Sequence, residues 1–138
     1  MTVAREIMTA DPACVRASDT VHDAAATMAR MSVGALPICG EDDKLKGMLT
    51  DRDIVVKVLA EGKDARAVHA GELAQGTPVM VSADADVSQV LRTMSEHQVR
   101  RLPVLDGDQL VGIVAQADVA RALDDPQVGE LVQALSVD

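Results

Sequence analysis

Aromatic residues are missing altogether: the sequence contains no Phe, Tyr or Trp. A protein without aromatic rings offers no platform on which the bases of a single-stranded nucleic acid can stack. Positive charge is also scarce, because 22 acidic residues outweigh 13 Lys and Arg and leave a formal net charge of −9. That charge repels a phosphate backbone, and no long basic run offsets it. The sequence therefore predicts that nucleic acid is not a partner.

Long apolar runs are absent as well. No stretch approaches the roughly 20 apolar residues that a membrane-spanning helix needs, so no membrane association is expected. The first residues, MTVAREIMTA, lack the charged start and the apolar block of a signal peptide. A cytoplasmic location is the expectation, and secretion by a route without a signal peptide stays open.

Residue patterns typical of catalysis and metal binding are lacking. The three histidines, His22, His69 and His97, are scattered, and the two cysteines do not form a CxxC motif. One His beside one Glu, as at Glu96-His97, does not make a metal site. No nucleophile–base pair and no paired carboxylates can be placed in a pocket. The sequence therefore favours a protein that is not an enzyme and that requires no metal or cofactor.

The sequence does contain an internal repeat. Matching residues keep a constant spacing along the chain, with one deletion near the middle of the repeat. The pairs include Pro12 and Pro78, Val33 and Val99, Leu36-Pro37 and Leu102-Pro103, Gly47 and Gly112, and Asp53 and Asp118. Register kept over so many positions indicates two copies of one unit. We assign residues 1–66, with an N-terminal helix, to the first copy and residues 67–138, with a linker helix and a C-terminal helix, to the second.

Each copy is predicted to fold as strand, helix, strand, strand, helix. In the first copy these elements are Ala13–Val15, Val21–Met31, strands within GALPICG (34–40) and KLKGMLT (44–50), and a helix after Thr50. In the second they are Val79–Val81, a helix from Asp86, Arg101–Leu105, Leu110–Ala115 and Gln116–Leu123. Further short helices are expected near Val3–Met8, at residues 69–75 and at Val128–Leu135.

Helical spacing predicts which side chains face the core. The expected inward residues are Val21, Ala24, Ala25, Met28 and Met31 on the first helix, and Ile54, Val55, Val58 and Leu59 on the helix after Thr50. A unit of about 60 residues is marginal by itself. We therefore expect an α/β (α+β) fold in which two β-α-β-β-α repeats pack through their sheets with pseudo-twofold symmetry.

The stretch GMLTDRD, residues 47–53, carries the most specific chemistry. A strand that leads directly into a helix presents backbone N–H groups to an anion. There the Thr50 hydroxyl can donate to a phosphate oxygen, the Asp53 carboxylate can accept both hydroxyls of a ribose, and Gly47 leaves room for a planar ring. The same residues are also a common way to start any helix, with Thr as N-cap and Asp one turn later. From these residues alone, both interpretations stay open.

The repeat, the paired segments VGALPI and VRRLPV, and the Gly-h-h-Thr-x-x-Asp pattern (h, apolar) together resemble a tandem pair of CBS domains, a Bateman module. The resemblance runs from Ile7 to Leu123 and is closest to stand-alone, two-repeat members of the family. It implies two symmetry-related clefts that bind AMP, ADP, ATP or S-adenosylmethionine. It also implies that Asp53 holds the ribose and that Thr50 helps to hold the phosphate.

The second copy matches this site only in part. Asp118 corresponds to Asp53 and Gly112 to Gly47, whereas Ala115 takes the place of Thr50. The first cleft is therefore expected to fill before the second. The resemblance assigns an apolar base pocket to positions that include Val15, Ala35, Leu36, Pro37, Met48, Val81, Leu102 and Pro103.

Arg101 lies just before the second Leu-Pro strand. It can neutralise a phosphate in a cleft, or it can be a solvated charge at the end of a helix.

The resemblance implies a regulatory module and a homodimer, with a nucleotide as its small-molecule partner. The alternative is a stress- or dormancy-related structural protein whose clefts bind no nucleotide and which a disulfide or a metal stabilises.

Cys14 and Cys39 fall on two strands that lie side by side in a right-handed strand–helix–strand unit. Two buried thiols and a Cys14–Cys39 disulfide are both compatible with this arrangement, and the disulfide stays a hypothesis.

Overall fold

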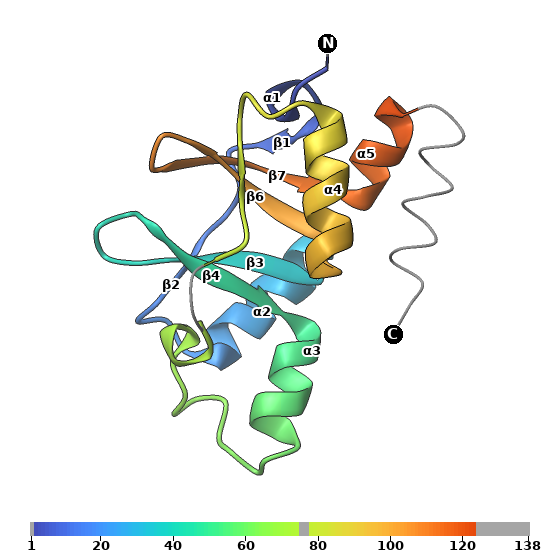
Figure 1. Ribbon diagram of the computed structural model, residues 1–138. Helices are drawn as coiled ribbons and strands as arrows, with labels where there is room; N and C mark the ends of the chain where they lie inside the picture. The colour runs from blue at the N-terminus through green and yellow to red at the C-terminus, as the bar shows by residue number, and fades with distance from the viewer. Residues whose placement is uncertain (1, 75–77, 124–138) are drawn as a thin grey trace. The chain divides into compact units, whose positions relative to one another are not determined.

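The computed structural model describes residues 2–74 and 78–123 (Figure 1). The chain divides into two compact units, which are described separately here. The repeat-1 unit consists of Ala13–Pro78. The repeat-2 unit consists of Met1–Pro12 together with Val79–Asp138. The expected helix at Val128–Leu135 lies outside the described residues.

The repeat-1 unit contains a three-stranded sheet in the order β2-β3-β4. Strand β2 (Val15–Arg16) runs parallel to β3 (Ala35–Cys39), which pairs antiparallel with β4 (Leu45–Thr50). Helix α2 (Val21–Met31) connects β2 to β3, and β4 leads into α3 (Asp51–Ile54). Helix α3 continues as a π-helical turn, η1 (Val55–Leu59), and a 3₁₀ turn, η2 (Ala70–Leu73), follows later.

The repeat-2 unit has the same order of elements, with one strand added. Its sheet has the order β1-β7-β6-β5, in which β5 is Val81–Ser82, β6 is Arg101–Asp106 and β7 is Gln109–Ala115. Helix α4 (Val87–His97) follows β5, and α5 (Gln116–Ala122) follows β7. The expected order of strand, helix, strand, strand and helix is therefore confirmed in both copies.

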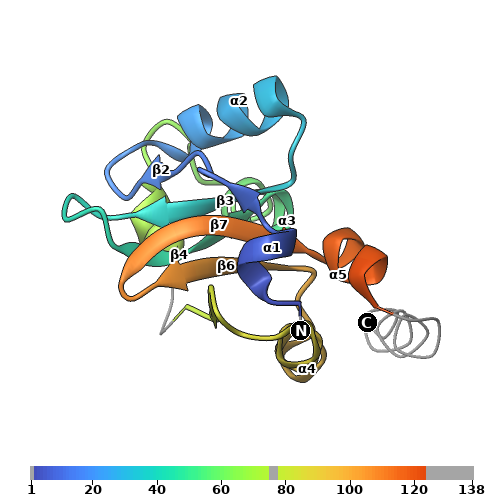
Figure 2. The same ribbon diagram turned by 90° about the horizontal axis from the view of Figure 1, so that it is seen from above.

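The N-terminal segment packs in the repeat-2 unit, although in the sequence it comes directly before the first copy. Helix α1 (Ala4–Ile7) lies against β7, and β1 (Thr9–Ala10) pairs antiparallel with that strand (Figure 2). The backbone N–H of Ala4 donates to the carbonyl oxygen of Ala85 at 2.8 Å. Conversely, η2 lies in the repeat-1 unit, where Ala70 N–H donates to Asp19 O at 2.8 Å. Helix α1 precedes the first copy in the sequence but lies in the repeat-2 unit, and η2 precedes the second copy but lies in the repeat-1 unit.

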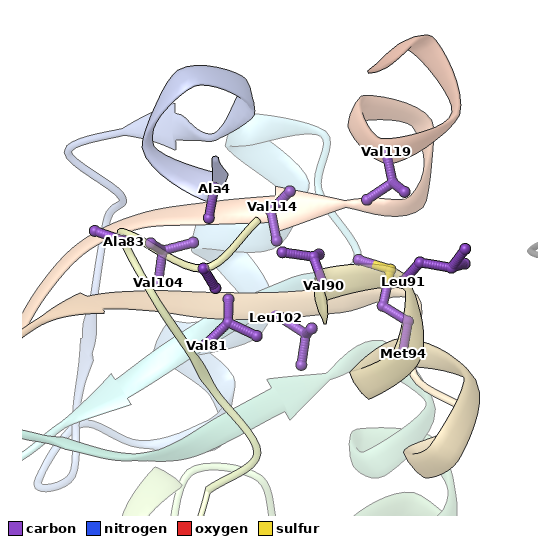
Figure 3. Close-up of a cluster of buried hydrophobic side chains, with 11 residues drawn as sticks. Ala4, Val81, Ala83, Val90, Leu91, Met94, Leu102, Val104, Val114 and Val119 are labelled. Carbon is purple, nitrogen blue, oxygen red and sulfur yellow. The ribbon is translucent and has the colours of Figure 1, made fainter. Parts of the chain in front are cut away.

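Both cores are aliphatic, as the lack of aromatic residues requires. In the repeat-2 unit, Ala4 from α1 packs among side chains of the sheet and α4, including Val104, Val114 and Val90 (Figure 3). In the repeat-1 unit, α2 and the helix after Thr50 cover the sheet with Val21, Met28, Ile54 and Val58. Each core therefore holds its unit together with branched aliphatic, Met and Ala side chains.

Three side chains that helical spacing placed inward are exposed. Met31, Val55 and Leu59 are 44%, 54% and 61% exposed, respectively. Met31 is the last residue of α2, while Val55 and Leu59 lie in η1, where the π-helical turn departs from the 3.6-residue period that the prediction assumed. Val58, in contrast, is fully buried.

Candidate functional site

The end of β4 and the start of α3 form the first strand–helix junction. The Thr50 hydroxyl oxygen accepts a hydrogen bond from Asp53 N–H at 3.0 Å, and Asp53 Oδ2 accepts one from Thr50 N–H at 3.0 Å. This reciprocal arrangement is a capping box. Both side chains are half-buried, so the junction is ordered by its own polar groups yet is still reachable from solvent.

The second junction, between β7 and α5, keeps only the carboxylate half of this arrangement. Asp118 Oδ2 accepts a hydrogen bond from Ala115 N–H at 2.8 Å. The backbone angles of the two N-cap residues are nearly the same, with φ −110° and ψ 160° at Thr50 and φ −108° and ψ 162° at Ala115. The hydroxyl is therefore not required for the chain to start this helix.

The second oxygen of each carboxylate faces a cation on the next helical turn. Asp53 Oδ1 lies 3.4 Å from Lys57 Nζ, and Asp118 Oδ1 lies 2.5 Å from an Arg121 guanidinium nitrogen. The Asp53 side chain is 25% exposed and the Asp118 side chain 13%. A ligand hydroxyl must share this oxygen with the cation, and the oxygen of Asp53 is the more accessible of the two. Sequence reasoning missed Lys57 and Arg121, although their spacing from each Asp is a recognisable helical pair.

Strand pairing brings part of the predicted site together. Ala35 lies opposite Thr50, and Pro37 lies opposite Met48. Because side chains alternate along a strand, these four residues share one face of the sheet, while the neighbouring Leu36 faces the core. Leu36 and Val15 are only 3% and 4% exposed within that core. Their place in the core explains why both positions are apolar without any ligand.

The same face in the repeat-2 unit carries a positive charge. Arg101 lies directly opposite Ala115, and Pro103 lies opposite Ile113. Arg101 is exposed, and side chains directly opposite each other in an antiparallel pair approach closely. The copy that lacks the hydroxyl therefore has a guanidinium across from the missing group. The internal repeat contained this signal, since Ala35 of the first copy aligns with Arg101 of the second.

The two motif glycines have another role than the one expected. A Cβ at Gly47 would lie 3.1 Å from the Cβ of Ala74, and one at Gly112 would collide with the side chain of Met8 and lie 3.0 Å from Thr9 O. Gly47 pairs with Ile38, so it lies on the core face of the sheet, whereas Thr50 lies on the other face. The expectation that these glycines leave room for a ligand ring is therefore wrong, because they admit a segment of their own unit.

Residues 2–74 and 78–123 contain no group of three or more His, Cys, Asp or Glu side chains arranged to hold a metal ion. His97 is the exposed last residue of α4. In the same part of the chain, no helix has the length and apolar character to cross a membrane. Cys14 and Cys39 are joined by a disulfide in the repeat-1 unit, with their Cα atoms 5.9 Å apart.

The sequence was compared with known families and proteins. The CBS domain family matches residues 4–60 and 70–125. Hypoxic response protein 1 of Mycobacterium tuberculosis is 50% identical over 135 residues, which cover 98% of this chain and 94% of that protein.

Solved structures show the same relationship. A crystal structure of hypoxic response protein I with two coordinated zinc ions is 52% identical, with a TM-score of 0.83, and the match covers 89% of this chain and all of that chain. The crystal structure of CBSX2 in complex with AMP is 25% identical, with a TM-score of 0.76, and the match covers 88% of this chain and 96% of that chain. Two matched repeats, shared over nearly the full length with these relatives, establish that the chain belongs to the CBS-domain family as a tandem CBS-domain protein.

Proposed function

We propose that this CBS-pair regulatory module senses an adenosine-type nucleotide, such as AMP, ADP, ATP or S-adenosylmethionine, at its strand–helix junctions. The observation that carries the proposal is the Thr50–Asp53 junction, whose hydroxyl and second carboxylate oxygen both have capacity left for a ligand. The AMP complex of the related CBSX2 supports the choice of ligand. We expect binding without catalysis.

Each group at the first junction has one contact to offer. The Thr50 oxygen already accepts from Asp53 N–H, so its proton is free to donate to a phosphate oxygen. Asp53 uses Oδ2 for the backbone of Thr50, which leaves Oδ1 to accept from a ribose hydroxyl once Lys57 moves aside. Ala35 and Met48 are half-buried on the face of Thr50 and supply small or apolar contacts to a base, while Pro37 on the same face is buried.

The second junction recognises a phosphate differently, through the Arg101 guanidinium that lies opposite Ala115. Its carboxylate is less available, because the Asp118 side chain is 13% exposed and the Asp53 side chain 25%. We therefore expect the Thr50–Asp53 site to fill first. Binding at the Arg101 site should depend more strongly on salt, since it depends on an exposed charge.

Isothermal titration calorimetry with AMP, ATP and S-adenosylmethionine tests the proposal. Thr50→Ala gives the first junction the residue of the second, and Ala115→Thr makes the reverse change, so each is a matched control for the other. We expect T50A to weaken the tighter site and A115T to strengthen the weaker one. A ligand at 100 times its dissociation constant should also stabilise the fold by about 2.7 kcal/mol. If none of the three ligands binds at millimolar concentration or raises the melting temperature, nucleotide sensing is ruled out.

We also propose that the protein is a homodimer that covers the exposed apolar side chains of the repeat-1 unit. These are Met31, Val33, Val55, Val56 and Leu59, the large hydrophobic residues that the described part of the chain leaves exposed. Sedimentation equilibrium of the wild type and of Leu59→Asp tests this assignment. A dimer that L59D converts to a monomer supports it, and a monomeric wild type contradicts it.

A second candidate function follows from hypoxic response protein I, whose crystal structure holds two zinc ions. In this alternative the junctions bind no nucleotide, and a metal or the Cys14–Cys39 disulfide stabilises a stress-related structural protein. His97 with the adjacent Glu96 does not make a metal site by itself, but His97 is exposed at the end of α4 and is a histidine that a zinc ion can reach. Zinc titration of the wild type and of His97→Ala tests the metal form of this alternative, in which zinc raises the melting temperature of the wild type and H97A abolishes that rise.

A further inference from the structure

The disulfide of the repeat-1 unit lies where the chain enters that unit. Cys14 directly precedes β2, and Cys39 is the last residue of β3. The two strands are parallel neighbours, with Val15 opposite Ile38 and Arg16 opposite Cys39. Pro12 and Ala13, only one or two residues before the bond, mark the passage of the chain from the repeat-2 unit to the repeat-1 unit. The bond therefore anchors the connecting segment to the central strand of the sheet.

The two half-cystines differ in their access to solvent. Cys14 is exposed, whereas Cys39 is 2% exposed. The backbone around Cys39 is held on both sides, because its carbonyl oxygen accepts from Ala17 N–H at 2.8 Å and the following Gly40 N–H donates to Lys44 O at 2.9 Å. The exposure of the two residues therefore favours Cys14 over Cys39 as the residue that a reagent from solvent meets first.

We propose that Cys14 is the site at which small thiols exchange with this protein. A thiolate from a low-molecular-weight thiol attacks Cys14 Sγ, and a new sulfur–sulfur bond forms there while the Cys14–Cys39 bond breaks. The electron pair of the broken bond leaves on Cys39 Sγ, which then takes a proton from solvent. The product is a mixed disulfide on Cys14 and a free thiol on Cys39. A second thiol releases Cys14 and is itself oxidised to the small-molecule disulfide.

Arg16 holds the backbone next to Cys39 in place. The Arg16 guanidinium donates to the carbonyl oxygen of Gly40, the residue after Cys39, at 3.0 Å. It also forms an ion pair with Asp43, and the hydrogen bond to that carboxylate raises the pKa of Arg16. These contacts fix the end of β3, so Cys39 stays close to Cys14 when the bond between them is broken.

The repeat-2 unit provides an internal contrast, since Met80 and Leu105 occupy the positions of the two cysteines. Thiol exchange therefore acts on one unit only. It removes the covalent anchor of the segment that connects the units, while the two β2–β3 pairs and the Arg16 contacts stay in place. The reverse attack by Cys39 on the mixed disulfide restores the bond, because the strands keep the two sulfurs close.

Two measurements test the proposal. Oxidised full-length protein is treated with 2-mercaptoethanol, quenched with acid at intervals and mapped by peptide mass spectrometry. We expect the mixed disulfide on the Cys14 peptide at about tenfold or more the level on the Cys39 peptide, because access controls the site of attack. An adduct that favours Cys39, or that is equal on both peptides, overturns the proposal. Protein that has never met a reductant and still has two free thiols also overturns it.

If the mixed disulfide is too short-lived to be mapped, variants with a single cysteine measure the reactivity of each thiol separately. Cys39→Ser leaves Cys14 alone, Cys14→Ser leaves Cys39 alone, and each reacts with 5,5′-dithiobis(2-nitrobenzoate) in the folded state and in guanidinium chloride. For each variant, the reaction rate of the folded protein is divided by the rate of the same variant in guanidinium chloride. This ratio should be about tenfold or more larger for C39S than for C14S. Circular dichroism confirms that both variants are folded. A smaller or reversed ratio overturns the assignment of Cys14.

Discussion

The two strand–helix junctions share one backbone and differ in their chemistry. Asp53 and Asp118 each cap the N–H of the residue that begins the helix, and the N-cap angles agree closely. Thr50 adds a hydroxyl to the first junction, whereas the second has Ala115 with Arg101 across from it. Both interpretations of the motif are compatible with this comparison. Starting a helix accounts for the aspartates and also for the Thr50 hydroxyl, which accepts from Asp53 N–H, and a role of that hydroxyl in binding stays a prediction.

The two units also differ in how their sheets are secured. The repeat-1 unit has a covalent link between β2 and β3, while the repeat-2 unit has an extra strand, β1, on the far side of β7. Arg5 of α1 reaches Asp106 at the hairpin of the repeat-2 unit, much as Arg16 reaches Asp43 in the repeat-1 unit. The disulfide secures the β2–β3 edge of one sheet, whereas β1 extends the β7 edge of the other.

Removing the disulfide should have the largest effect on this comparison. The bond links residues separated by 25 positions, and the chain-entropy model assigns such a loop about 3 kcal/mol of stability. We expect the double variant C14S/C39S to lose about this much in urea unfolding, with hydrogen exchange accelerated only in the repeat-1 unit. Wild-type protein in excess reductant is the control and should behave like the variant. If hydrogen exchange were accelerated equally in both units, the disulfide would not act on the repeat-1 unit alone.

A methyl group at either motif glycine tests how closely each unit packs on it. Gly112→Ala forces the Met8 side chain away from β7 and should cost about 1–3 kcal/mol through overpacking. Gly47→Ala is the matched change and should cost less, because its new Cβ meets only Ala74, at 3.1 Å. Thermal unfolding of both variants provides the measurement. A smaller loss for G112A than for G47A would show that the docked N-terminal segment adapts more easily than the contact with Ala74.

Each of two single changes, Thr50→Ala and Ala115→Thr, makes the two junctions more alike. Thr50→Ala removes one N-cap hydrogen bond and should cost about 1 kcal/mol of stability. Ala115→Thr should stabilise the second helix by an amount of similar size, since the backbone there already has the N-cap conformation. Urea unfolding of both variants without ligand measures these differences. If T50A costs nothing, the hydroxyl has no structural role and only the binding role is left.

The pH dependence associated with Glu72 should be the smallest of these effects. The N–H of His69 donates to Glu72 Oε2 at 2.7 Å, and this bond lowers the pKa of Glu72 below its ordinary value of 4.5. A carboxyl group with a lowered pKa in the folded state stabilises the fold above its ordinary pKa. That contribution is lost as the pH falls through the lowered value.

Glu72→Gln is the comparison, because it cannot ionise. The melting temperatures of wild type and E72Q should differ by a constant amount near neutral pH and converge in acid. A difference that grows as the pH falls would reverse the expected sign.

Local patterns in the sequence predicted the elements well. Helix α2 spans Val21–Met31 as expected, because Thr20 caps it and its apolar residues follow the helical period. The internal repeat then predicted the same elements in the second copy. Lys57 and Arg121 were missed as partners of the aspartates, although both lie within one helical turn of them.

Short elements and exposed faces were harder to predict. Strand β1 has two residues, and its place beside β7 depends on pairing with a strand far along the chain. The exposure of Val55 and Leu59 depends on a π-helical turn, which changes the side-chain period within one helix.

The sequence by itself determined the two repeats, their order of elements and the carboxylate at each junction, because these depend on neighbouring residues and on local hydrogen bonds. Tertiary structure decided which unit holds α1 and η2, that the motif glycines admit Met8 and Ala74, and that Arg101 lies opposite Ala115. Those features join residues that are distant in the chain, and packing and strand register select them.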